Sequence, residues 1–270
     1  MSKLTFKINT IMDISKHFDL KGKTAIVTGG AGGIGKACCE ILAAYGAKVV
    51  VSDYNLAAAE ETSKAINDNG GTSIAIDCNV LEDKALINLV DKTIEKFGSI
   101  EILVNNVGGG GAGKESPYDI EVAQFKKVFD MNVFSMWRLC QLVAPHMKKA
   151  GYGSIINMSS MASINKSPAI SAYASSKAAI NHMTRNLAYD YGPDNIRVNA
   201  IGPGATRTHA LSTVLTPELE KAMLKHTPIH RLGESEDIAG AVLYFAAPIS
   251  SWTSGQVIFI NGGGEQTLDM

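Results

Sequence analysis

The sequence predicts an α/β fold: a single doubly wound domain with a seven-stranded parallel sheet and helices on both faces. Short, continuously apolar runs rich in Val and Ile recur from Lys23 onward, and amphipathic segments separate them. Continuous apolar strands are typical of a sheet that is covered on both faces. Strand–helix alternation favours right-handed parallel βαβ units, and neither a low-complexity linker nor an internal repeat divides the chain.

The predicted strands are short runs in which β-branched residues dominate. They occupy residues 24–28, 48–52, 73–78, 101–105, 154–159, 196–201 and 256–260. The segments between them place their apolar residues at helical spacing, as helices that cover a sheet do. These segments occupy residues 35–45, 83–97, 123–150, 173–191 and 235–246.

Residues 202–234 interrupt this alternation. Two turns that contain proline flank a short helical piece, residues 217–225. A long excursion after a late strand is typical of a segment that covers a substrate, although a plain surface insertion has the same pattern. We therefore predict a substrate flap at about residues 205–230, inside a catalytic domain of residues 21–270. Residues 1–20 are predicted to be an N-terminal extension, with Met12 as an alternative start.

Composition narrows the classes of function. Hydrophobic residues make up 46% of the chain, enough for a sizeable core, and the formal net charge is −1. No cluster of Lys and Arg predicts a nucleic-acid or membrane partner, and no apolar run is long enough to cross a bilayer. The 4 cysteines show no metal or disulfide spacing, which favours a reduced, cytoplasmic compartment. Pro228 between His226 and His230 separates the one histidine pair at metal-like spacing, so no metal site is predicted.

The first glycine run, TGGAGGIG, lies between the first predicted strand and the first helix. Gly29 permits a tight turn, Gly33 lets the backbone approach a pyrophosphate, and Gly35 allows close packing of helix on sheet. The next strand ends at Asp53, whose carboxylate can accept hydrogen bonds from both ribose hydroxyls and would repel a 2′-phosphate. A plain turn and a plain strand end are the alternatives. Together, the glycine run and Asp53 predict a Rossmann-like site that prefers NAD over NADP.

The second glycine run follows the fourth predicted strand. Gly108, Gly113 and Lys114 have the spacing of a phosphate-binding P-loop, but Glu115 stands where that loop needs a hydroxyl for magnesium. In a doubly wound sheet this run lies across the crevice from the first loop. We therefore expect the bare backbone around residues 108–111 to leave space for a bulky ligand rather than to hold a nucleoside triphosphate.

The candidate catalytic side chains are polar residues near the carboxyl ends of late strands. Tyr173 and Lys177 share one helix face, where an ammonium group and an oxidised nicotinamide would favour the phenolate of a general base. Such a pair is also common on surface helices. Ser160 and Ser159 are equally placed to hold a substrate oxygen, and periodicity does not choose between them. Asn132 lies in a mostly apolar helix, either as a satisfied core amide or as part of a site.

These residues form an ordered set that spans most of the chain. The motifs are Thr28-Gly29-x3-Gly33-x-Gly35, Asn105-Asn106-x-Gly108, Asn132, Ser160, Tyr173-x3-Lys177 and Pro203-Gly204. In order across residues 20–264, the set resembles the short-chain dehydrogenase/reductase family. The resemblance implies that Ser160 and Asn132 match the catalytic serine and asparagine of the family. It also implies a homotetramer, with the helices around 123–149 and 173–191 at one interface.

The resemblance implies a role for each catalytic residue. Tyr173 takes the hydroxyl proton of an alcohol while a hydride leaves the carbinol carbon for the nicotinamide. Ser160 polarises the oxygen, Lys177 lowers the pKa of Tyr173 and holds the nicotinamide ribose, and Asn132 anchors a water. The implied cofactor contacts are Gly29, Gly33, Ile34, Gly35, Asp53, Tyr54, Asn79, Val80, Asn106, Tyr173, Lys177, Thr206, Arg207 and Thr208.

Within the contact set, the resemblance places Ile34, Asp53 and Tyr54 on the adenosine side and residues 206–208 over the nicotinamide end. Three residues depart from the family pattern. Asn79 and Asn261 stand where the family usually has Asp, and Val107 replaces the usual Ala. The amide of the first can still pair with the exocyclic amine of adenine.

Local agreements such as NNVGGGG, SSMASINKS and HTPIHRLG resemble the bacterial 7α-hydroxysteroid dehydrogenases of the family. That resemblance implies oxidation of the 7α-hydroxyl of bile acids to a 7-oxo product, with Gly110 and Asn165 contacting the steroid alongside Ser160 and Tyr173. The predicted flap is apolar, as a rigid steroid requires. Its apolar residues are Leu211, Val214, Leu215, Met223 and Leu224.

Two other functions stay open. One is an NAD(P)-dependent reductase of 3-oxoacyl carrier protein or of another small carbonyl compound. Most such reductases prefer NADPH, which Asp53 disfavours. The other is a non-catalytic dinucleotide-binding module, which we would expect to lack part of the catalytic set. All four members are present: Asn132, Ser160, Tyr173 and Lys177.

Overall fold

The computed structural model describes residues 14–110, 115–166, 168–212 and 215–264. Five positions that the sequence analysis singled out lie outside these ranges: Met12, Gly111, Gly113, Lys114 and Val214.

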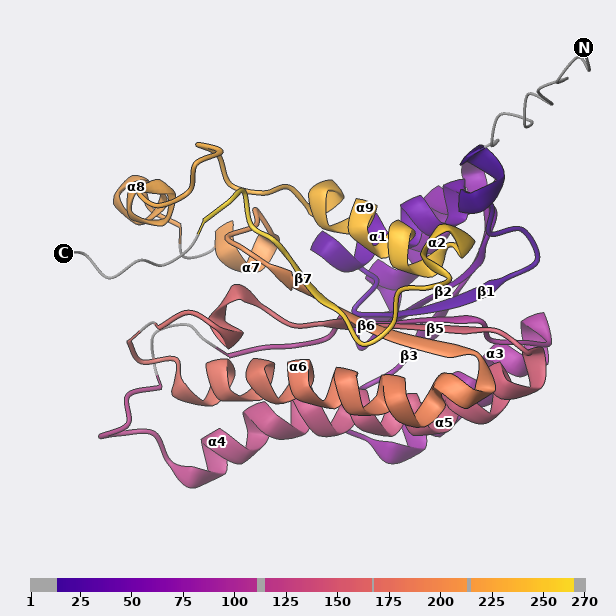
Figure 1. Cartoon of the computed structure of the whole chain (residues 1–270), viewed down its shortest axis with the longest axis horizontal. Coiled ribbons are helices and arrows are strands. Elements are labelled where there is room, and N and C mark those ends of the chain that lie inside the picture. Colours follow the sequence, from indigo (N-terminus) through magenta and orange to yellow (C-terminus); the bar gives the residue numbers. More distant parts are fainter. Residues whose placement is uncertain (1–13, 111–114, 167, 213–214, 265–270) are drawn as a thin grey trace, which may run out of the picture.

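One parallel sheet of seven strands forms the centre of the molecule (Figure 1), and its strand order is β3-β2-β1-β4-β5-β6-β7. The predicted fold class is therefore confirmed. The strands are β1 (Thr24–Thr28), β2 (Lys48–Asp53), β3 (Thr72–Asp77), β4 (Ile102–Asn105), β5 (Gly153–Met158), β6 (Ile196–Pro203) and β7 (Val257–Ile260).

Two separate apolar layers, one on each face of the sheet, explain why the strands read as continuous apolar runs. Every residue of β1, β4 and β5 is buried, because alternate side chains point into opposite layers. In β1, Val27 belongs to the layer with α1 (Gly33–Ala44) and α9 (Ser235–Ala246), whereas Ile26 belongs to the layer with α3 (Asp83–Phe97) and its neighbours.

Helices cover both faces, and Figure 1 shows α1, α2 and α9 on one face and α3, α5 and α6 on the other. The remaining helices are α2 (Leu56–Asp68), α4 (Val122–Phe129), α5 (Ser135–Ala150), α6 (Ser171–Tyr191), α7 (His209–Ser212) and α8 (Pro217–Leu224). Helices α2 and α7 were not among the predicted segments.

The single helix predicted over residues 123–150 is wrong in one respect. A π-helical turn (Asp130–Phe134) separates α4 from α5. Such turns widen the helix by one residue and are frequent at functional sites. This one contains Asn132, so the polar residue in the apolar helix occupies an irregular turn.

The strand order changes direction at β1. Thr28 ends β1 and pairs with β2, while Val27 pairs with Val51 on one side and with Val104 of β4 on the other. The segments that follow β1 and β4 therefore diverge at the carboxyl ends of these strands. A crevice at this point is where open α/β sheets bind ligands.

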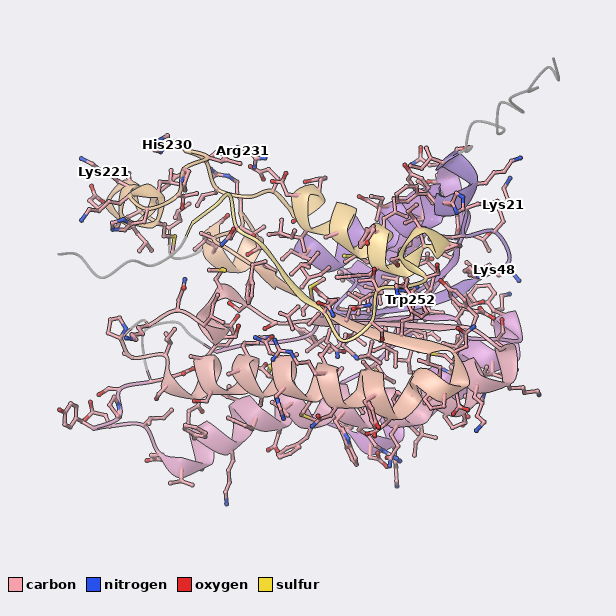
Figure 2. The ribbon with its side chains drawn as sticks, in the orientation of Figure 1. Lys21, Lys48, Lys221, His230, Arg231 and Trp252 are labelled. Atoms are coloured by element: carbon pink, nitrogen blue, oxygen red, sulfur yellow. The ribbon has the colours of Figure 1, made fainter. Side chains whose placement is uncertain are left out.

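The predicted flap lies at the same end of the sheet. Figure 2 shows Lys221 and Arg231 at the opposite end of the molecule from Lys21 and Lys48. Because β2 begins at Lys48, the flap lies at the end of the molecule to which the carboxyl ends of the strands point. No residue of α8 is buried among the described residues. In Figure 1 this helix stands apart from the sheet. The domain and flap bounds themselves stay a prediction.

The cysteines and the helices bear on two further expectations. Cys38, Cys39, Cys78 and Cys140 are all buried free thiols, as predicted. Within the described residues, no helix combines the length and the apolar character that crossing a membrane requires.

Candidate active site

The first glycine run forms a tight turn from β1 into α1. Gly29 has a φ of +66°, a conformation that glycine adopts without strain. A Cβ atom on Gly35 would collide with the carbonyl oxygen of Gly29, so close packing of helix on loop requires glycine there. Gly32 is the N-cap of α1, and it has no side chain that could accept hydrogen bonds from the N–H groups of the first turn. These N–H groups are therefore available to an anion.

Asp53 lies beside this loop at the end of β2. The side chain is buried, its Oδ2 accepts a hydrogen bond from the N–H of Ala31 at 3.1 Å, and its Oδ1 accepts one from Asn55 at 3.0 Å. Each carboxylate oxygen has a further lone pair for a ligand hydroxyl. The glycine loop thus holds the carboxylate in one orientation.

The second glycine run packs directly against the first. Asn106 donates from Nδ2 to the carbonyl oxygens of Thr28 at 3.0 Å and Gly29 at 3.2 Å. The hydroxyl oxygen of Thr28 accepts hydrogen bonds from the N–H groups of Asn106 at 3.0 Å and Val107 at 3.2 Å. The prediction that the two runs face each other across the crevice is confirmed. Asn106 is the residue that joins them.

A cavity of about 290 Å³ extends from this junction along the ends of β2 and β3. Its lining residues are Gly29, Asp53, Tyr54, Cys78, Asn79, Val80, Leu81, Asn106, Val107, Gly108 and Met131. Asn79 lines it, but its Nδ2 donates to Glu82 at 2.8 Å and its Oδ1 accepts from the N–H of Leu81 at 3.2 Å. The amide of Asn79 is thus hydrogen-bonded to the turn that precedes α3.

A second cavity of about 250 Å³ continues from the first, since both are lined by Asn106 and Gly108. Its lining residues are Ile34, Asn106, Gly108, Met158, Ser159, Ser160, Tyr173, Lys177, Pro203, Gly204, Thr206 and Thr208. Ile34, which was predicted on the adenosine side, lines the second cavity together with Tyr173 and Lys177, and its contact with a cofactor stays a prediction. The two cavities form one cleft along the carboxyl edge of the sheet.

Lys177 lies at the bottom of this cleft with only 3% of its surface exposed. Its Nζ donates to the carbonyl oxygen of Met158 at 2.8 Å and lies 5.6 Å from the centre of the Tyr173 ring. Burial lowers the pKa of Lys177 to about 8, because the interior disfavours the charged ammonium.

The pKa of Tyr173 is raised above its ordinary value. Burial is the main cause, the negative charge of Glu115 adds to it, and a hydrogen bond with Ser160 acts in the opposite direction. The expectation that Lys177 lowers this pKa stays a prediction. The ammonium of Lys177 donates its hydrogen bond to the carbonyl oxygen of Met158.

The structure separates the two adjacent serines. The hydroxyl of Ser159 is buried and donates to the carbonyl oxygen of Lys177 at 3.2 Å, so it serves the helix. The hydroxyl oxygen of Ser160 accepts from the N–H of Ala162 at 3.1 Å and shares a hydrogen bond with Tyr173. Ser160 is therefore the serine that faces the tyrosine.

Asn132 braces the second glycine run against α6. Its Oδ1 accepts from the N–H of Gly109 at 2.8 Å, and its Nδ2 donates to the carbonyl oxygen of Gly109 at 2.9 Å and to the hydroxyl of Ser176 at 2.9 Å. The hydroxyl of Ser176 in turn donates to the carbonyl oxygen of Tyr173 at 2.7 Å. The amide connects the loop to the tyrosine, and its role as a water anchor stays a prediction.

Comparison with known proteins identifies the family of this chain. A family model described as enoyl-(acyl carrier protein) reductase matches residues 29–265. A 7α-hydroxysteroid dehydrogenase of Escherichia coli (strain K12) is 48% identical over 94% of this chain and 99% of its own. The chain belongs to the short-chain dehydrogenase/reductase family.

Other relatives are consistent with this assignment. A 7α-hydroxysteroid dehydrogenase of Clostridium sardiniense is 37% identical over 90% of this chain and 94% of its own. A solved structure of a 7α-hydroxysteroid dehydrogenase in complex with NADH and 7-oxo glycochenodeoxycholic acid superposes with a TM-score of 0.91. It is 48% identical and covers 96% of this chain and 100% of its own. The family and the doubly wound fold predicted from the motifs are therefore confirmed.

Some of the residues that were predicted to contact the cofactor do not line the cleft. The side chain of Arg207 extends to Glu220, with 3.1 Å between nitrogen and oxygen, and to Glu234, with 3.5 Å. Thr206 and Thr208, on either side of it, do line the second cavity. Gly33 instead lies at the start of α1, where a Cβ atom would approach Thr208 at 3.6 Å.

Gly110 and Asn165, the two predicted steroid contacts besides Ser160 and Tyr173, differ in position. Gly110 has a φ of +109°, and a Cβ atom there would lie 3.3 Å from the Cβ of Tyr173. Asn165 follows the turn after β5 and is not among the described residues that line either cavity. The backbone at Gly110 thus packs closely against the tyrosine. Contact between a substrate and either Gly110 or Asn165 stays a prediction.

Two of the departures from the family pattern have clear positions. Val107 lines the first cavity, as expected of a residue beside the cofactor. The Nδ2 of Asn261 donates to the carbonyl oxygen of Gly264 at 2.6 Å and contacts the sulfur of Met161 at 3.1 Å. Because Met161 follows Ser160 directly, Asn261 ties the end of β7 to the turn that contains the serine.

Sequence reasoning did not assign three groups that contact the catalytic side chains. They are the carboxylate of Glu115, the hydroxyl of Ser176 and the carbonyl oxygen of Met158. Ser176 stands one helical turn after Tyr173, and that spacing was a signal that could have found it. No local pattern points from Met158 to Lys177, since the contact is made across the fold.

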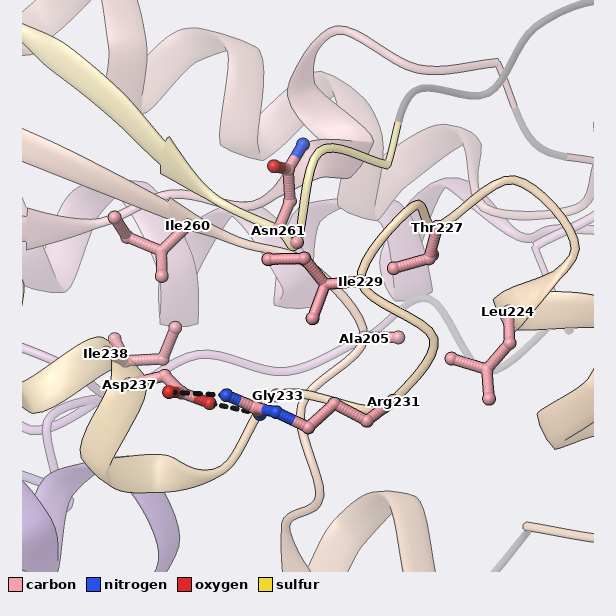
Figure 3. A pocket seen from close by; sticks show the side chains of 11 residues that line it. Ala205, Leu224, Thr227, Ile229, Arg231, Gly233, Asp237, Ile238, Ile260 and Asn261 are labelled. Carbon is pink, nitrogen blue, oxygen red and sulfur yellow. Dashed lines mark hydrogen bonds and ion pairs between the residues drawn. The ribbon is translucent and has the colours of Figure 1, made fainter.

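A third cavity of about 190 Å³ separates the flap from the ends of β6 and β7 (Figure 3). Arg231 closes one side of it by donating to both oxygens of Asp237, at 2.6 and 2.9 Å. This pairing lowers the pKa of Asp237 to about 2. The cavity shares no lining residue with the cleft among the described residues. The ion pair therefore attaches the chain just after the flap to α9 without contacting the catalytic side chains.

His226 and His230 do not form a metal centre with their neighbours in the part of the chain that the structure describes. There, no group of three or more His, Cys, Asp and Glu side chains is arranged to hold an ion.

Proposed function

We propose that the chain catalyses the reversible, NAD-dependent oxidation of the 7α-hydroxyl of bile acids and related hydroxysteroids to the 7-oxo product. The observation that carries the proposal is the cluster of Ser160, Tyr173 and Lys177 at one end of the cleft. It occurs in a chain 48% identical, over nearly the full length, to a 7α-hydroxysteroid dehydrogenase.

The residues of the cleft fit NAD. The uncapped first turn of α1 suits a pyrophosphate, and the oriented carboxylate of Asp53 suits the two hydroxyls of an adenosine ribose. Asn106 walls both parts of the cleft, and Lys177 reaches the end where a nicotinamide ribose would lie. When bound, NAD supplies the acceptor for the hydride that leaves the carbinol carbon.

The side chains around that carbon handle the proton. Tyr173, as its phenolate, accepts the proton of the substrate hydroxyl, and Ser160 donates a hydrogen bond to the same oxygen. Because burial raises the pKa of Tyr173, positive charge nearby is required to populate the phenolate at neutral pH. The ammonium of Lys177 supplies part of that charge once it holds a ribose instead of the carbonyl oxygen of Met158 alone. Asn132 keeps the loop at Gly109 in place throughout.

The substrate would lie between the second glycine run and the flap. Gly110 packs against Tyr173 without a side chain of its own, and we assign Gly110, Asn165 and the apolar residues of the flap to the steroid. A hydroxyl group on a rigid, apolar ring system can reach Ser160 only if the neighbouring backbone has no bulky side chains. The bare glycines after β4 meet this requirement.

The test follows the formation of NADH by its absorbance with three substrates: cholate, its 7β-epimer and an acetoacetyl thioester in the reverse direction. We expect oxidation of cholate and little turnover of the epimer. Turnover of the thioester without turnover of cholate would replace the proposed substrate with a 3-oxoacyl group. The description of the matching family model makes an acyl carrier protein substrate the second candidate, whereas Asp53 disfavours the NADPH that such reductases prefer.

The assembly and location are part of the same proposal. We assign a homotetramer, because Phe134 and Trp137 expose 57% and 42% of their surface along the α5 region and would be covered by a second copy. The four buried free thiols favour the cytoplasm. Light scattering of the purified protein tests the assembly, and a monomer at micromolar concentration would contradict it.

A further inference from the structure

Glu115 is a buried carboxylate beside Tyr173 to which the mechanism above gives no role. Only 4% of its surface is exposed, and it forms an isolated parallel bridge with Ile170, which directly precedes α6. Carboxylates are rarely buried unless hydrogen bonds hold them. Its position is therefore built into the fold.

Among the described residues, three hydrogen bonds join Glu115 to the segment at the start of α6. The N–H of Glu115 donates to the carbonyl oxygen of Ala169 at 2.9 Å, and the hydroxyl of Ser171 donates to the carbonyl oxygen of Glu115 at 3.0 Å. The side chain completes the set, because its Oε2 accepts from the N–H of Tyr173 at 2.8 Å. The carboxylate thus caps the first turn of the helix at the catalytic tyrosine itself.

The local backbone shows that this arrangement is constrained. Ala169 has a φ of +53°, a left-handed conformation that residues with a Cβ atom rarely adopt. Such strain persists only where the surrounding contacts over-determine it. The contact that uses the carbonyl oxygen of Ala169 is the hydrogen bond from Glu115.

Gly110 packs between the carboxylate and the tyrosine. A Cβ atom at this position would lie 2.9 Å from Oε1 of Glu115 and 3.3 Å from both Cβ and Cδ2 of Tyr173. Gly110, the carboxylate of Glu115 and the ring of Tyr173 therefore form one packed unit. A displacement of the carboxylate would move the wall behind the phenol.

We propose that Glu115 is a positioning residue: through its hydrogen bond to the main chain of Tyr173, the carboxylate holds the phenol toward Ser160 and keeps a negative charge beside it. The proposal rests on the proposed dehydrogenase function of the cleft. It assigns Glu115 a part in setting the pH range over which the tyrosine works.

The charges around Tyr173 give the direction of this effect. Glu115 faces it from the segment before α4 and raises its pKa, in addition to burial, while the hydrogen bond from Ser160 lowers it. Lys177 faces the ring from α6 itself. Oxidation of an alcohol needs the phenolate and reduction of a ketone needs the phenol. The carboxylate therefore favours reduction at a given pH and moves the onset of oxidation to higher pH.

Two variants separate the charge from the hydrogen bond. Glu115→Gln keeps the size of the side chain and an acceptor for the N–H of Tyr173 but removes the charge. We expect the acid limb of kcat/KM for cholate oxidation to move to lower pH, with the plateau changed by less than about twofold. Glu115→Ala removes the acceptor as well, and we expect its plateau to fall by about tenfold to a hundredfold with NADH affinity retained. Glu121→Gln, an exposed residue of the same segment, is the matched control.

A second readout needs no substrate. The ultraviolet titration of tyrosine, taken as the difference between each protein and its Tyr173→Phe counterpart, follows Tyr173 alone. We expect this titration to move to lower pH in Glu115→Gln and to stay in place in Glu121→Gln. An unmoved titration in Glu115→Gln, or an unchanged plateau in Glu115→Ala, overturns the proposal. If the unsubstituted enzyme does not oxidise cholate, the proposed substrate fails while the titration still decides the role of Glu115.

Discussion

The Nζ of Lys177 lies 5.6 Å from the centre of the Tyr173 ring but donates its hydrogen bond to the carbonyl oxygen of Met158. The pair shares one helix face, as its spacing predicted, yet the ammonium is oriented by the end of β5 rather than by the phenol. The hydrogen bond to Met158 thus holds the ammonium group of the lysine beside the ring of the tyrosine. Four predictions follow from this and related contacts.

Tyr173→Phe should lower kcat for cholate oxidation by at least about a hundredfold, because the general base is lost. NADH affinity, measured by fluorescence titration, should stay within about twofold, since the glycine loop and Asp53 are unchanged. Tyr189→Phe is the matched control, because Tyr189 lies on the same helix with 87% of its surface exposed. Full activity of Tyr173→Phe would refute the assignment of the base.

Lys177 should make stability depend on pH in a defined direction. Burial lowers its pKa from 10.5 to about 8, so the folded chain binds fewer protons than the unfolded chain between these values. The cost of the buried charge is full below about pH 8 and is lost as pH rises toward the unfolded value, so this lysine makes stability rise with pH in that window.

Lys177→Met removes this cost, of order 3 kcal/mol or less after the lost hydrogen bond to Met158 is counted. The free energy of unfolding, measured by urea denaturation, should favour the variant most near pH 7 and progressively less toward pH 10. Lys149→Met, at an exposed position of α5, is the control and should show no such trend. A difference between Lys177→Met and the parent that does not change with pH would contradict the lowered pKa.

Gly35→Ala should destabilise the chain by at least about 2 kcal/mol, because its Cβ atom would collide with the carbonyl oxygen of Gly29. NADH binding should be lost with it, since the loop must move. Gly240→Ala is the matched control: it also lies within a helix, no described atom lies within 4 Å of the added Cβ, and it should stabilise by about 0.5–1 kcal/mol. Thermal unfolding measures both, and equal midpoints would contradict the prediction.

Asp53→Asn should weaken the preference for NAD. The charge that would repel a 2′-phosphate disappears, so the ratio of kcat/KM for NAD to that for NADP should fall by at least about tenfold. Asp77→Asn serves as control, because Asp77 ends the neighbouring strand β3 and is exposed. A ratio that stays unchanged in Asp53→Asn would show that cofactor choice is made elsewhere in the cleft.

Much of the fold was predictable because its signals are local. Each strand of the sheet appears as an apolar run, and the predicted ends differ from the observed ones by only a few residues, as for β6, which continues to Pro203. The glycine loop, Asp53, and the pair of Tyr173 and Lys177 were also recognisable from spacing along the chain. Helix periodicity failed at Asp130–Phe134, since a π-helical turn adds one residue without changing the apolar character of the segment.

By itself, the sequence determined the doubly wound sheet, the cofactor loop and the catalytic residue types, because these depend on the order and spacing of nearby residues. Only the tertiary structure decided that the hydroxyl of Ser159 donates to the carbonyl oxygen of Lys177, and that the carboxylate of Glu115 accepts from the N–H of Tyr173. Glu115 and Tyr173 are separated by 58 residues in the chain. Their contact exists only because parallel strands bring the segments after β4 and β5 to the same edge of the sheet.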